Sequence, residues 1–300
     1  MAYESVLLNK VIDINKIVTI HYFEYMSNFS FYGESHDFWE FLYVDKGEIN
    51  VTADKSTYTL KKDEIIFHEP NEFHNVKANG HIAPNLVVIS FECTSKAMDF
   101  FKKKRFKITE NERNFLANII LEAKNSFMPP FDNPYVEHLT RNNASIFGSE
   151  QLIKMNLEAF LIYLIRREKE KKIVPEPALQ LKKKSNLELY KQINLYLNKN
   201  LSCHLSIDQI AKDNLISRSQ LQKIFQEQTQ EGVIEHFSKM KIDTAKQLIR
   251  NNIYNFTEIA NQLGYSSVHY FSRQFKKITG MSPSEYSASV KGLSEHPSPK

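Results

Sequence analysis

Imidazole and carboxylate side chains lie close together in the first part of the sequence. His36 and Glu40 are four residues apart, and His74 follows further along. This combination could bind a divalent metal ion, for which imidazole and carboxylate are suitable ligands. It could instead form hydrogen bonds with an organic ligand in an apolar pocket, or it could have a purely structural role. Of these interpretations we favour ligand binding, and we expect no metal and no cofactor.

Two aromatic residues lie in the same segment as Glu40. Trp39 and Tyr43 alternate with other residues along F-W-E-F-L-Y-V and could line the same pocket. Both could instead be core residues, above all Trp39, the only tryptophan of the chain, because large aromatic side chains contribute strongly to cores. We include both, so that the predicted ligand site consists of His36, Trp39, Glu40, Tyr43 and His74.

A second group of candidate residues lies near the C-terminus in two similar segments. Residues 206–225 resemble residues 256–275, with an offset of 49 between Ile210 and Ile259 and of 50 between Leu221 and Phe271. A repeat of this length indicates a repeated supersecondary unit. The change of offset predicts one extra residue early in the second helix of the second copy.

Each copy has the pattern of a short helix, a tight turn and a second short helix, which is typical of a helix-turn-helix. In the turn of the second copy Gly264 tolerates a left-handed backbone, and we expect Asn214 to take that place in the first copy. Ser217 and Ser266 are predicted to cap the second helices with their side-chain oxygens.

The second helix of each copy predicts a surface that reads DNA. Arg273 could pair with guanine and Gln222 with adenine, whereas lysines would contact phosphate. The alternative for Arg273 is a salt bridge with Glu258 or Glu285. The residues expected to face inward in the second copy are Tyr270, Phe271 and Phe275. The predicted DNA contacts are Arg218, Ser219, Gln222, Lys223, Ser267, His269, Ser272, Arg273, Lys276 and Lys277.

The second copy and the segment after it resemble the signature of the AraC/XylS family of bacterial transcription regulators. The resemblance lies in residues 259–286, I-A-N-Q-L-G-Y-S-S-V-H-Y-F-S-R-Q-F-K-K-I-T-G-M-S-P-S-E-Y. It implies a DNA-binding domain with two helix-turn-helix units joined by a linker helix. The first copy departs from the family pattern at Gln230, where glycine is expected, and at His236, where tyrosine is expected. Lys241 replaces the usual arginine of the linker helix.

The N-terminal part resembles the cupin barrel that serves as the sensor domain in many regulators of this family. Catalytic cupins bind a metal through two histidines, a glutamate and a further histidine, but here Glu34 occupies the position two residues before His36. The resemblance implies a barrel that holds a small effector. It is carried by the order His36, Glu40, Gly47, Asp63, Pro70 and His74.

The elements around these residues change character along the chain. Short runs rich in β-branched and aromatic residues extend from about residue 17 to residue 91, as in an all-β sandwich or barrel. Gly47, with a strand on either side, predicts a hairpin turn. Residues 109–124 and 149–169 have helical spacing, and the second helix is apolar on a face wide enough to need covering on more than one side. A second subunit could provide part of this cover, as the family resemblance favours; the alternative is core within the chain.

These elements predict an α+β multidomain fold. Residues 1–105 form a cupin-like, ligand-sensing β-barrel, and residues 106–170 form a helical dimerisation segment. Residues 171–185, with two prolines and a lysine run, form a linker. Residues 186–300 form an all-α, AraC-type DNA-binding domain with two helix-turn-helix motifs.

The composition agrees with this division. Residues 182–291 contain 16 Lys and Arg against 9 Asp and Glu, which leaves 23 against 26 in the rest of the chain. A basic C-terminal part is expected of a DNA-binding module. Cys93 and Cys203 are too few for a disulfide framework or a thiolate metal site. The sequence has neither a signal-peptide pattern nor a membrane-length apolar run, and we expect a cytoplasmic protein.

The sequence therefore predicts a DNA-binding transcription activator that responds to a small-molecule effector. From what is common in the family, a sugar or a related metabolite is our first choice of effector. The expected partners are double-stranded DNA, the effector, a second copy in a homodimer, and RNA polymerase, and no catalytic residue is expected. The alternatives are a metal-binding cupin enzyme fused to a DNA-binding module, and a constitutive dimeric regulator without an effector.

Overall fold

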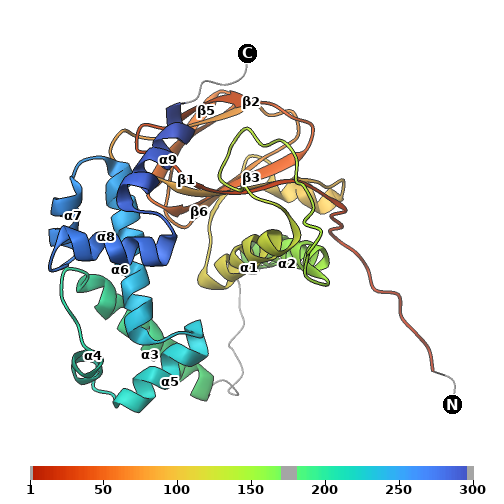
Figure 1. Ribbon diagram of the computed structural model, residues 1–300. Coiled ribbons are helices and arrows are strands. Elements are labelled where there is room, and N and C mark those ends of the chain that lie inside the picture. The colour runs from red at the N-terminus through yellow and green to blue at the C-terminus, as the bar shows by residue number, and fades with distance from the viewer. Residues whose placement is uncertain (1–2, 170–180, 296–300) are drawn as a thin grey trace. The chain divides into compact units, whose positions relative to one another are not determined.

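The computed structural model of the chain describes residues 3–169 and 181–295 (Figure 1). Residues 3–169 and residues 181–291 fall into two compact units, and the boundary between them lies in the stretch that the structure does not describe. The predicted linker, residues 171–185, lies mostly in that stretch. Helix α3 begins at Leu181, so the last part of the predicted linker is helical. The lysine run is compatible with a helix because lysine is a good helix former and both prolines precede it.

The first unit contains two antiparallel β-sheets, one in the strand order β1-β8-β3-β6-β9 and the other in the order β2-β7-β4-β5. The strands are β1 (Lys16–Glu24), β2 (Ser30–Glu34), β3 (Trp39–Lys46), β4 (Glu48–Ala53), β5 (Ser56–Lys61), β6 (Glu64–His68), β7 (His74–Lys77), β8 (Asn85–Glu92) and β9 (Arg105–Lys107). The predicted β-rich N-terminal domain is confirmed. Because β9 pairs with β6, the sheet continues beyond residue 105.

Alternation along β3 divides its side chains between two cores. Leu42 and Val44 point between the sheets, where they pack with apolar residues of the second sheet such as Val51. The alternate residues point to the outer face of the first sheet, since successive side chains of a strand face opposite ways. These outward residues are Trp39, Phe41 and Tyr43.

Gly47 lies at a corner between the sheets rather than in a hairpin. β3 pairs with β6 and β8, whereas β4 pairs with β5 and β7, so the chain passes from one sheet to the other at Gly47. Its φ is +74°, and a Cβ at this position would lie 2.5 Å from the carbonyl oxygen of Ala83. The predicted hairpin is wrong because two strands around a glycine look the same whether they pair with each other or with different strands.

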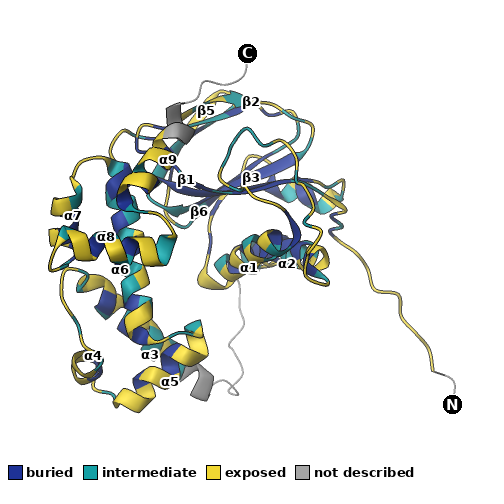
Figure 2. Ribbon diagram, in the orientation of Figure 1, coloured by how far each residue is buried: buried dark blue, intermediate teal, exposed yellow. Residues whose placement is uncertain are grey.

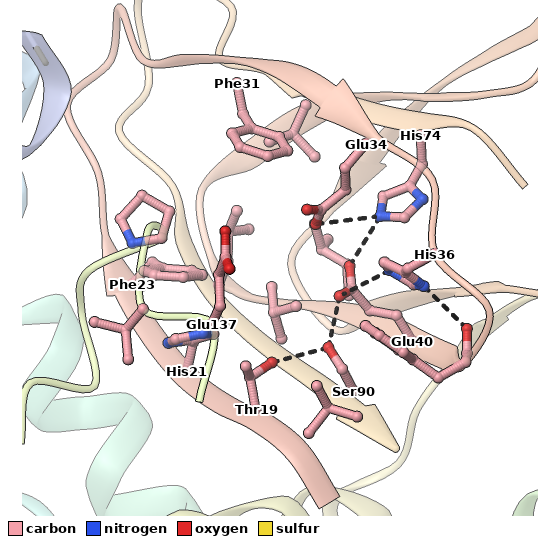
Figure 3. Close-up of a pocket in the computed structure, with 18 of the residues that line it drawn as sticks. Thr19, His21, Phe23, Phe31, Glu34, His36, Glu40, His74, Ser90 and Glu137 are labelled. Carbon is pink, nitrogen blue, oxygen red and sulfur yellow. Dashed lines mark hydrogen bonds and ion pairs between the residues drawn. The ribbon is translucent and has the colours of Figure 1, made fainter. Parts of the chain in front are cut away.

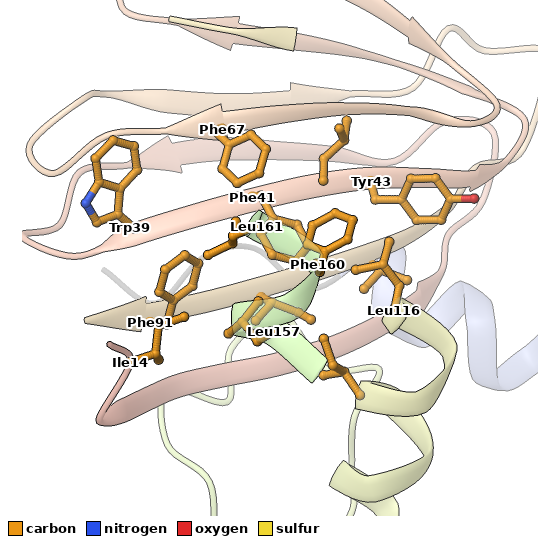
Figure 4. Packing of buried hydrophobic residues seen from close by; sticks show 14 of the residues in the cluster. Ile14, Trp39, Phe41, Tyr43, Phe67, Phe91, Leu116, Leu157, Phe160 and Leu161 are labelled. Carbon is orange, nitrogen blue, oxygen red and sulfur yellow. The ribbon is translucent and has the colours of Figure 1, made fainter. Parts of the chain in front are cut away.

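Two helices cover the outer face of the first sheet (Figure 4). After a short 3₁₀ helix, η1 (Lys96–Phe101), the chain forms α1 (Glu110–Ser126) and α2 (Ser149–Lys169). Phe160 of α2 packs on Phe41 of β3, with ring centroids 5.6 Å apart. The side of α2 that carries Leu152 and Met155, which are 40% and 54% exposed, remains uncovered within the described chain.

The second unit is all helical, and its helices bury one side and expose the other (Figure 2). Helix α4 with α5, and helix α7 with α8, form two helix-turn-helix units, which confirms the predicted fold of this part. The core of the first helix-turn-helix includes Leu221 and Phe225. Phe271 and Phe275 are buried at the corresponding positions of the second helix-turn-helix. The helices are α3 (Leu181–Lys199), α4 (Ile207–Asp213), α5 (Arg218–Thr229), α6 (Val233–Asn251), α7 (Phe256–Gln262), α8 (Val268–Thr279) and α9 (Pro283–Glu295).

The left-handed residue of the first turn is Leu215, not Asn214. Leu215 has a φ of +55°, which matches the φ of +65° at Gly264 in the second turn. Asn214 is the C-cap of α4 instead, and its side-chain amide donates a hydrogen bond to the carbonyl oxygen of Ile210 at 2.8 Å. The prediction for Asn214 is wrong because its side chain satisfies a carbonyl oxygen at the end of α4 from the C-cap position, one residue before the left-handed residue.

The cap of α8 is Ser267, not Ser266. The Ser267 side chain accepts a hydrogen bond from the backbone N–H of Tyr270 at 3.1 Å, as Ser217 does from Gln220 in α5. The extra residue of the second copy therefore lies in the turn before α8, and not within the helix as predicted.

The departures from the family pattern leave the first helix-turn-helix intact. Gln230, at the C-cap of α5, has a left-handed φ of +59°, and Gly280 has a φ of +82° at the C-cap of α8. His236 lies with Nε2 2.9 Å from Asn194 Oδ1 and with Nδ1 3.2 Å from Glu231 Oε1. Gln230 thus has the same left-handed C-cap conformation as Gly280, and His236 makes two polar contacts within the helical unit.

Candidate functional site: barrel pocket and recognition helices

A cavity of about 350 Å³ lies between the two sheets of the first unit (Figure 3). This volume is in the range of small-molecule binding sites. Its apolar lining includes Phe23, Tyr25, Phe31, Leu42, Val76, Leu86 and Val88. Its polar lining consists of Thr19, His21, Glu34, His36, Glu40, His74, Ser90 and Glu137.

Four of the polar side chains converge at one side of the cavity, and we call them the donor cluster: Glu34, His36, Glu40 and His74. One ring nitrogen or carboxylate oxygen from each lies within 4.8 Å of the others. Glu34 ends β2, Glu40 lies in β3 and His74 begins β7. Gly33 allows β2 to approach β7, because a Cβ there would lie 2.7 Å from the carbonyl oxygen of His74.

Hydrogen bonds orient both histidines of the cluster. Nδ1 of His36 donates to the carbonyl oxygen of Phe38, and Nδ1 of His74 donates to that of Glu72, each at 3.1 Å. A carbonyl oxygen can only accept, so Nδ1 carries a proton in both rings. The Nε2 atoms face Glu40, at 3.6 Å from His36 to Oε2 and at 3.3 Å from His74 to Oε1.

Two hydroxyls position the buried carboxylate of Glu40. Ser90 Oγ donates to Glu40 Oε2 at 2.7 Å, and Thr19 Oγ1 donates to Ser90 Oγ at 2.9 Å. Ser90 lies on β8, the strand next to β3, and Thr19 lies on β1, the strand on the other side of β8. The carboxylate is therefore fixed from behind while its other side faces the two imidazoles.

The cluster holds opposite charges in a buried place. Burial by itself raises the pKa of the Glu40 carboxyl, but the imidazoles of His36 and His74 outweigh it and hold the pKa well below its usual range. Burial lowers the pKa of His74, but Glu34 and Glu40 beside it raise the pKa to about 10. When no other positive charge is present at the site, His74 is therefore a cation at neutral pH, and it compensates the Glu40 carboxylate.

Trp39 and Tyr43 do not line the cavity. Both are buried on the face of β3 opposite Glu40, in the core that α1 and α2 cover (Figure 4). Since side chains alternate along a strand, a residue adjacent to Glu40 or three positions from it points the other way. Their assignment to the ligand site is therefore corrected to the core, whereas His36, Glu40 and His74 lie at the cavity.

Several lining residues were missed by sequence reasoning. Thr19 and Ser90 are polar residues that point inward from apolar strands, and this mismatch was a usable signal. His21 lies two residues after Thr19, on the same face of β1. Glu137 comes from the loop between α1 and α2, and it points into the cavity (Figure 3). No pattern in the sequence indicates that this loop reaches the cavity.

The predicted DNA contacts lie on α5 and α8. Arg273 is exposed, with its guanidinium carbon 5.9 Å from the centroid of the Tyr270 ring. The carboxylates of Glu258 and Glu285, the alternative partners, accept from backbone N–H groups at the starts of α7 and α9. The other exposed candidates are Arg218, Ser219, Gln222 and Lys223 on α5 and His269, Lys276 and Lys277 on α8.

Three residues of this surface differ in detail from expectation. Tyr270 was expected to face inward but is 41% exposed. Ser267 is engaged as the cap of α8, and the half-buried Ser272 donates its hydroxyl to the carbonyl oxygen of Val268 at 2.8 Å. Both serines therefore have an intrahelical role, in addition to any contact with DNA.

A buried lysine joins the two helix-turn-helix units. Nζ of Lys241, on α6, donates to the carbonyl oxygens of Cys203 and Leu263, both at 2.8 Å. Burial lowers the pKa of this lysine. At Gly264 a Cβ would lie 2.0 Å from the carbonyl oxygen of Ser202. The loop before α4 and the turn before α8 are thus in direct contact.

Two models of known domains match the chain over these two regions. The AraC-like ligand binding domain matches residues 17–89, from β1 to β8, and a helix-turn-helix domain matches residues 210–289, from α4 to α9. The chain belongs to the AraC family of transcription regulators. The cavity thus lies in the ligand-binding domain of this regulator, and the exposed sides of α5 and α8 belong to its DNA-binding domain.

Known relatives of this AraC-family regulator are similar over different lengths. The uncharacterized HTH-type transcriptional regulator YfiF of Bacillus subtilis is 26% identical over 278 residues, which are 88% of this chain and 81% of that protein. The arabinose operon regulatory protein of Salmonella typhimurium is 33% identical over 85 residues, 28% of this chain and 30% of that protein. The regulator therefore spans less than a third of that second relative.

Among solved structures, ToxT from Vibrio cholerae O395 is 15% identical, with a TM-score of 0.35 over 92% of this chain and 98% of that one. Within the described ranges, the regulator has no helix that is both long enough and apolar enough to span a membrane.

Proposed function

We propose that this regulator activates transcription when a small effector binds in the cavity of its ligand-binding domain. The observation that carries this proposal is the cavity itself, which lies between two sheets and combines an apolar wall with a fixed set of polar groups. An effector that binds one arrangement of the protein more tightly shifts the population toward it. The relatives, whose names describe regulators, support a role without catalysis.

We propose a sugar or a related hydroxylated metabolite as the effector. Hydroxyl groups could form hydrogen bonds with Glu40 and His36, and Phe23 and Phe31 offer apolar surface to the faces of a ring. The arabinose regulator is similar over a stretch about as long as the helix-turn-helix match. A match of that length is too short to include a ligand-binding domain as well, so the support for a sugar comes from the side chains of the cavity.

On DNA, we propose that α5 and α8 enter successive segments of the major groove, about 34 Å apart on one face of the duplex. Gln222 and Arg273 would contact base edges, where adenine and guanine are their preferred partners. Lys223, Lys276 and Lys277 would contact phosphates, which set the position of the protein but not its sequence preference.

We further propose that the regulator is a homodimer that contacts RNA polymerase at its promoters in the cytoplasm. The uncovered side of α2 with Leu152 and Met155 supports a dimer, because exposed apolar residues on one helix face are a common interface feature.

Three measurements on the full-length protein test the proposal. Selection of bound duplexes from a random library followed by footprinting should show two protected segments about 10 base pairs apart. A thermal-shift screen of sugars and related metabolites should find a ligand that raises the melting temperature. Transcription in vitro from a promoter with the selected site should rise when that ligand is added. A uniform footprint would refute sequence-specific binding, and a fall in transcription would refute activation.

A further inference from the structure

We propose that the donor cluster binds one divalent transition-metal ion at the side of the effector cavity, with Glu34, His36, Glu40 and His74 as its ligands. The ligand type fits such an ion, because imidazole nitrogen and carboxylate oxygen suit zinc, manganese, iron, cobalt and nickel. The sequence alone led us to expect no metal, and what changes this expectation is the geometry of the four side chains.

The distances within the cluster lie within about 0.4 Å of those between ligands of one ion. Nitrogen and oxygen ligands lie about 2.1 Å from such a metal, so neighbouring ligands of one ion are about 3.0–3.4 Å apart. His74 Nε2 lies 3.3 Å from Glu40 Oε1 and 3.8 Å from Glu34 Oε1, and His36 Nε2 lies 3.6 Å from Glu40 Oε2. The largest separation, 4.8 Å, exceeds the span across an ion by about 0.6 Å. The Glu34 side chain is 49% exposed, so it has room to move toward the other three.

The buried nitrogens of the cluster lack hydrogen bonds of their own. Nε2 of His36 and Nε2 of His74 are both buried without a hydrogen-bond partner. Buried polar atoms normally have one, whereas these two nitrogens meet carboxylate oxygens of Glu40 and Glu34 only as ion pairs at 3.3–3.8 Å. A metal ion between them and Glu40 would satisfy all three groups. It would replace the proton of His74 as the positive charge beside the two carboxylates.

The outer contacts of the cluster are those that metal ligands use. Nδ1 of each histidine donates to a backbone carbonyl, which fixes the ring and leaves Nε2 for the ion. Ser90 donates to Glu40 and is itself held by Thr19. These contacts hold His36, His74 and Glu40 in place before any ion binds.

The effector cavity continues beyond the cluster, past Phe31 and Phe23 (Figure 3). An oxygen donor of a bound molecule could therefore complete the coordination of the ion, as substrates do at open metal sites. This second step rests on the proposed effector function, whereas binding of the ion does not.

The test uses the full-length protein, stripped with a chelator and dialysed. Titration with Zn²⁺ and Mn²⁺ by calorimetry, and with Co²⁺ by visible absorption, should give one ion per chain for at least one metal and ligand-field bands for cobalt. His36→Ala, Glu40→Gln and His74→Ala should each weaken binding by more than about 100-fold, since even outer contacts of metal ligands contribute about 10–100-fold. Glu34→His should keep the site, because imidazole can replace the carboxylate as a ligand.

The matched controls are Glu137→Gln and His21→Gln, which line the same cavity outside the cluster. Both should bind the ion within about twofold of the parent, a change too small to reflect a lost ligand. Circular dichroism checks that each variant is folded. Absence of binding for all three metals overturns the proposal, and so does binding that survives both His36→Ala and His74→Ala, because the ion would then be elsewhere.

These outcomes are separate from those for the proposed function. If the ion binds but no metabolite changes transcription, the metal site stands and the effector function fails. If a metabolite binds and activates the chelator-treated protein, and no metal binds, the effector function stands and the metal site fails.

Discussion

Arg273 is an exposed side chain on α8 whose candidate partners within the domain, Glu258 and Glu285, are engaged at helix starts. We therefore predict that Arg273→Ala weakens binding to the selected operator by about 1–3 kcal/mol, or about 5–150-fold, and relaxes the preference at one base pair. Fluorescence anisotropy with the operator and its single-base variants measures both effects. Arg166→Ala, an exposed arginine of the first unit, is the control and should change neither. Equal affinity of parent and variant would assign Arg273 another role.

His21 predicts a pH dependence of stability. Burial lowers its pKa from the ordinary 6.5, although the Glu40 charge opposes this, so the folded protein keeps His21 neutral. The unfolded chain takes up a proton as the pH falls below 6.5, so stability is lost toward acid, by at most about 1.4 kcal/mol per pH unit from this residue.

His21→Gln should therefore reduce the loss of stability between about pH 7 and pH 5.5. Urea unfolding with chelator present, followed by the fluorescence of buried Trp39, reports on the first unit. The exposed His81→Gln is the matched control and should leave the pH dependence as it is. An identical slope for parent and His21→Gln would contradict the prediction.

For single residues, the sequence indicated which side chains could bind a ligand better than it indicated which way those side chains point. The combination of His36, Glu40 and His74 drew attention to residues that line the cavity, because Glu40 interrupts the apolar run F-W-E-F-L-Y-V. Trp39 and Tyr43 were assigned by proximity to Glu40, but the strand alternation puts them in the core. Glu137 could not be predicted, since its position depends on how a long loop folds back onto the barrel.

Between the elements, the two turns offer a paired test. Leu215 is 94% exposed and left-handed, so its side chain gains little from burial but the backbone is strained. Glycine at this position would relieve about 1–2 kcal/mol of backbone strain in the folded state. It would also increase the entropy of the unfolded chain, which costs about 0.4–1 kcal/mol of stability. We therefore predict that Leu215→Gly stabilises the domain by about 0.5–1 kcal/mol.

Gly264→Ala, at the equivalent position, should destabilise the domain by at least about 2 kcal/mol, because the methyl group would also meet the backbone of Ser202. Chemical unfolding followed by far-ultraviolet circular dichroism reports the helical unit in both variants. A loss of stability for Leu215→Gly would show that the leucine makes a contact worth more than the strain.

The helices were predictable, and the connections between them were less so. Apolar residues three or four apart, such as Leu221 and Phe225, locate α5 because only one helix face can be buried. The repeat then located α8. The cap at Ser267 and the corner at Gly47 depend on single-residue placement and on which strands pair, neither of which a local pattern determines.

For the whole molecule, the uncovered side of α2 predicts the state of association. If the homodimer forms there, Leu152→Ser with Met155→Ser should shift the protein toward monomer while changing the stability of the fold little, since both side chains are already about half exposed. Light scattering after size exclusion measures the mass. Leu195→Ser, an exposed leucine at 64% in the second unit, is the control. A dimer that survives the double substitution would place the interface elsewhere.

The response to salt also belongs to the whole molecule. Lys223, Lys276 and Lys277 are exposed on the recognition helices, and each proposed phosphate contact contributes about 0.9 to the slope of log affinity against log salt. The triple alanine variant should therefore reduce the magnitude of this slope by nearly 3. The exposed Lys61, Lys62 and Lys77 of the first unit provide a control triple of equal charge. Parallel lines for parent and variant would exclude these phosphate contacts.

The contact of Lys241 with two carbonyl oxygens, and of Gly264 with the backbone of Ser202, has a consequence for promoters. Because these contacts hold the two helix-turn-helix units together, the protein cannot change the distance or the rotation between α5 and α8. A single base pair inserted between the two half-elements of an operator would turn one of them by about a tenth of a helical turn and shift it by 3.4 Å. Promoters under the control of this regulator should thus keep the same number of base pairs between the two half-elements, even where their base sequences differ.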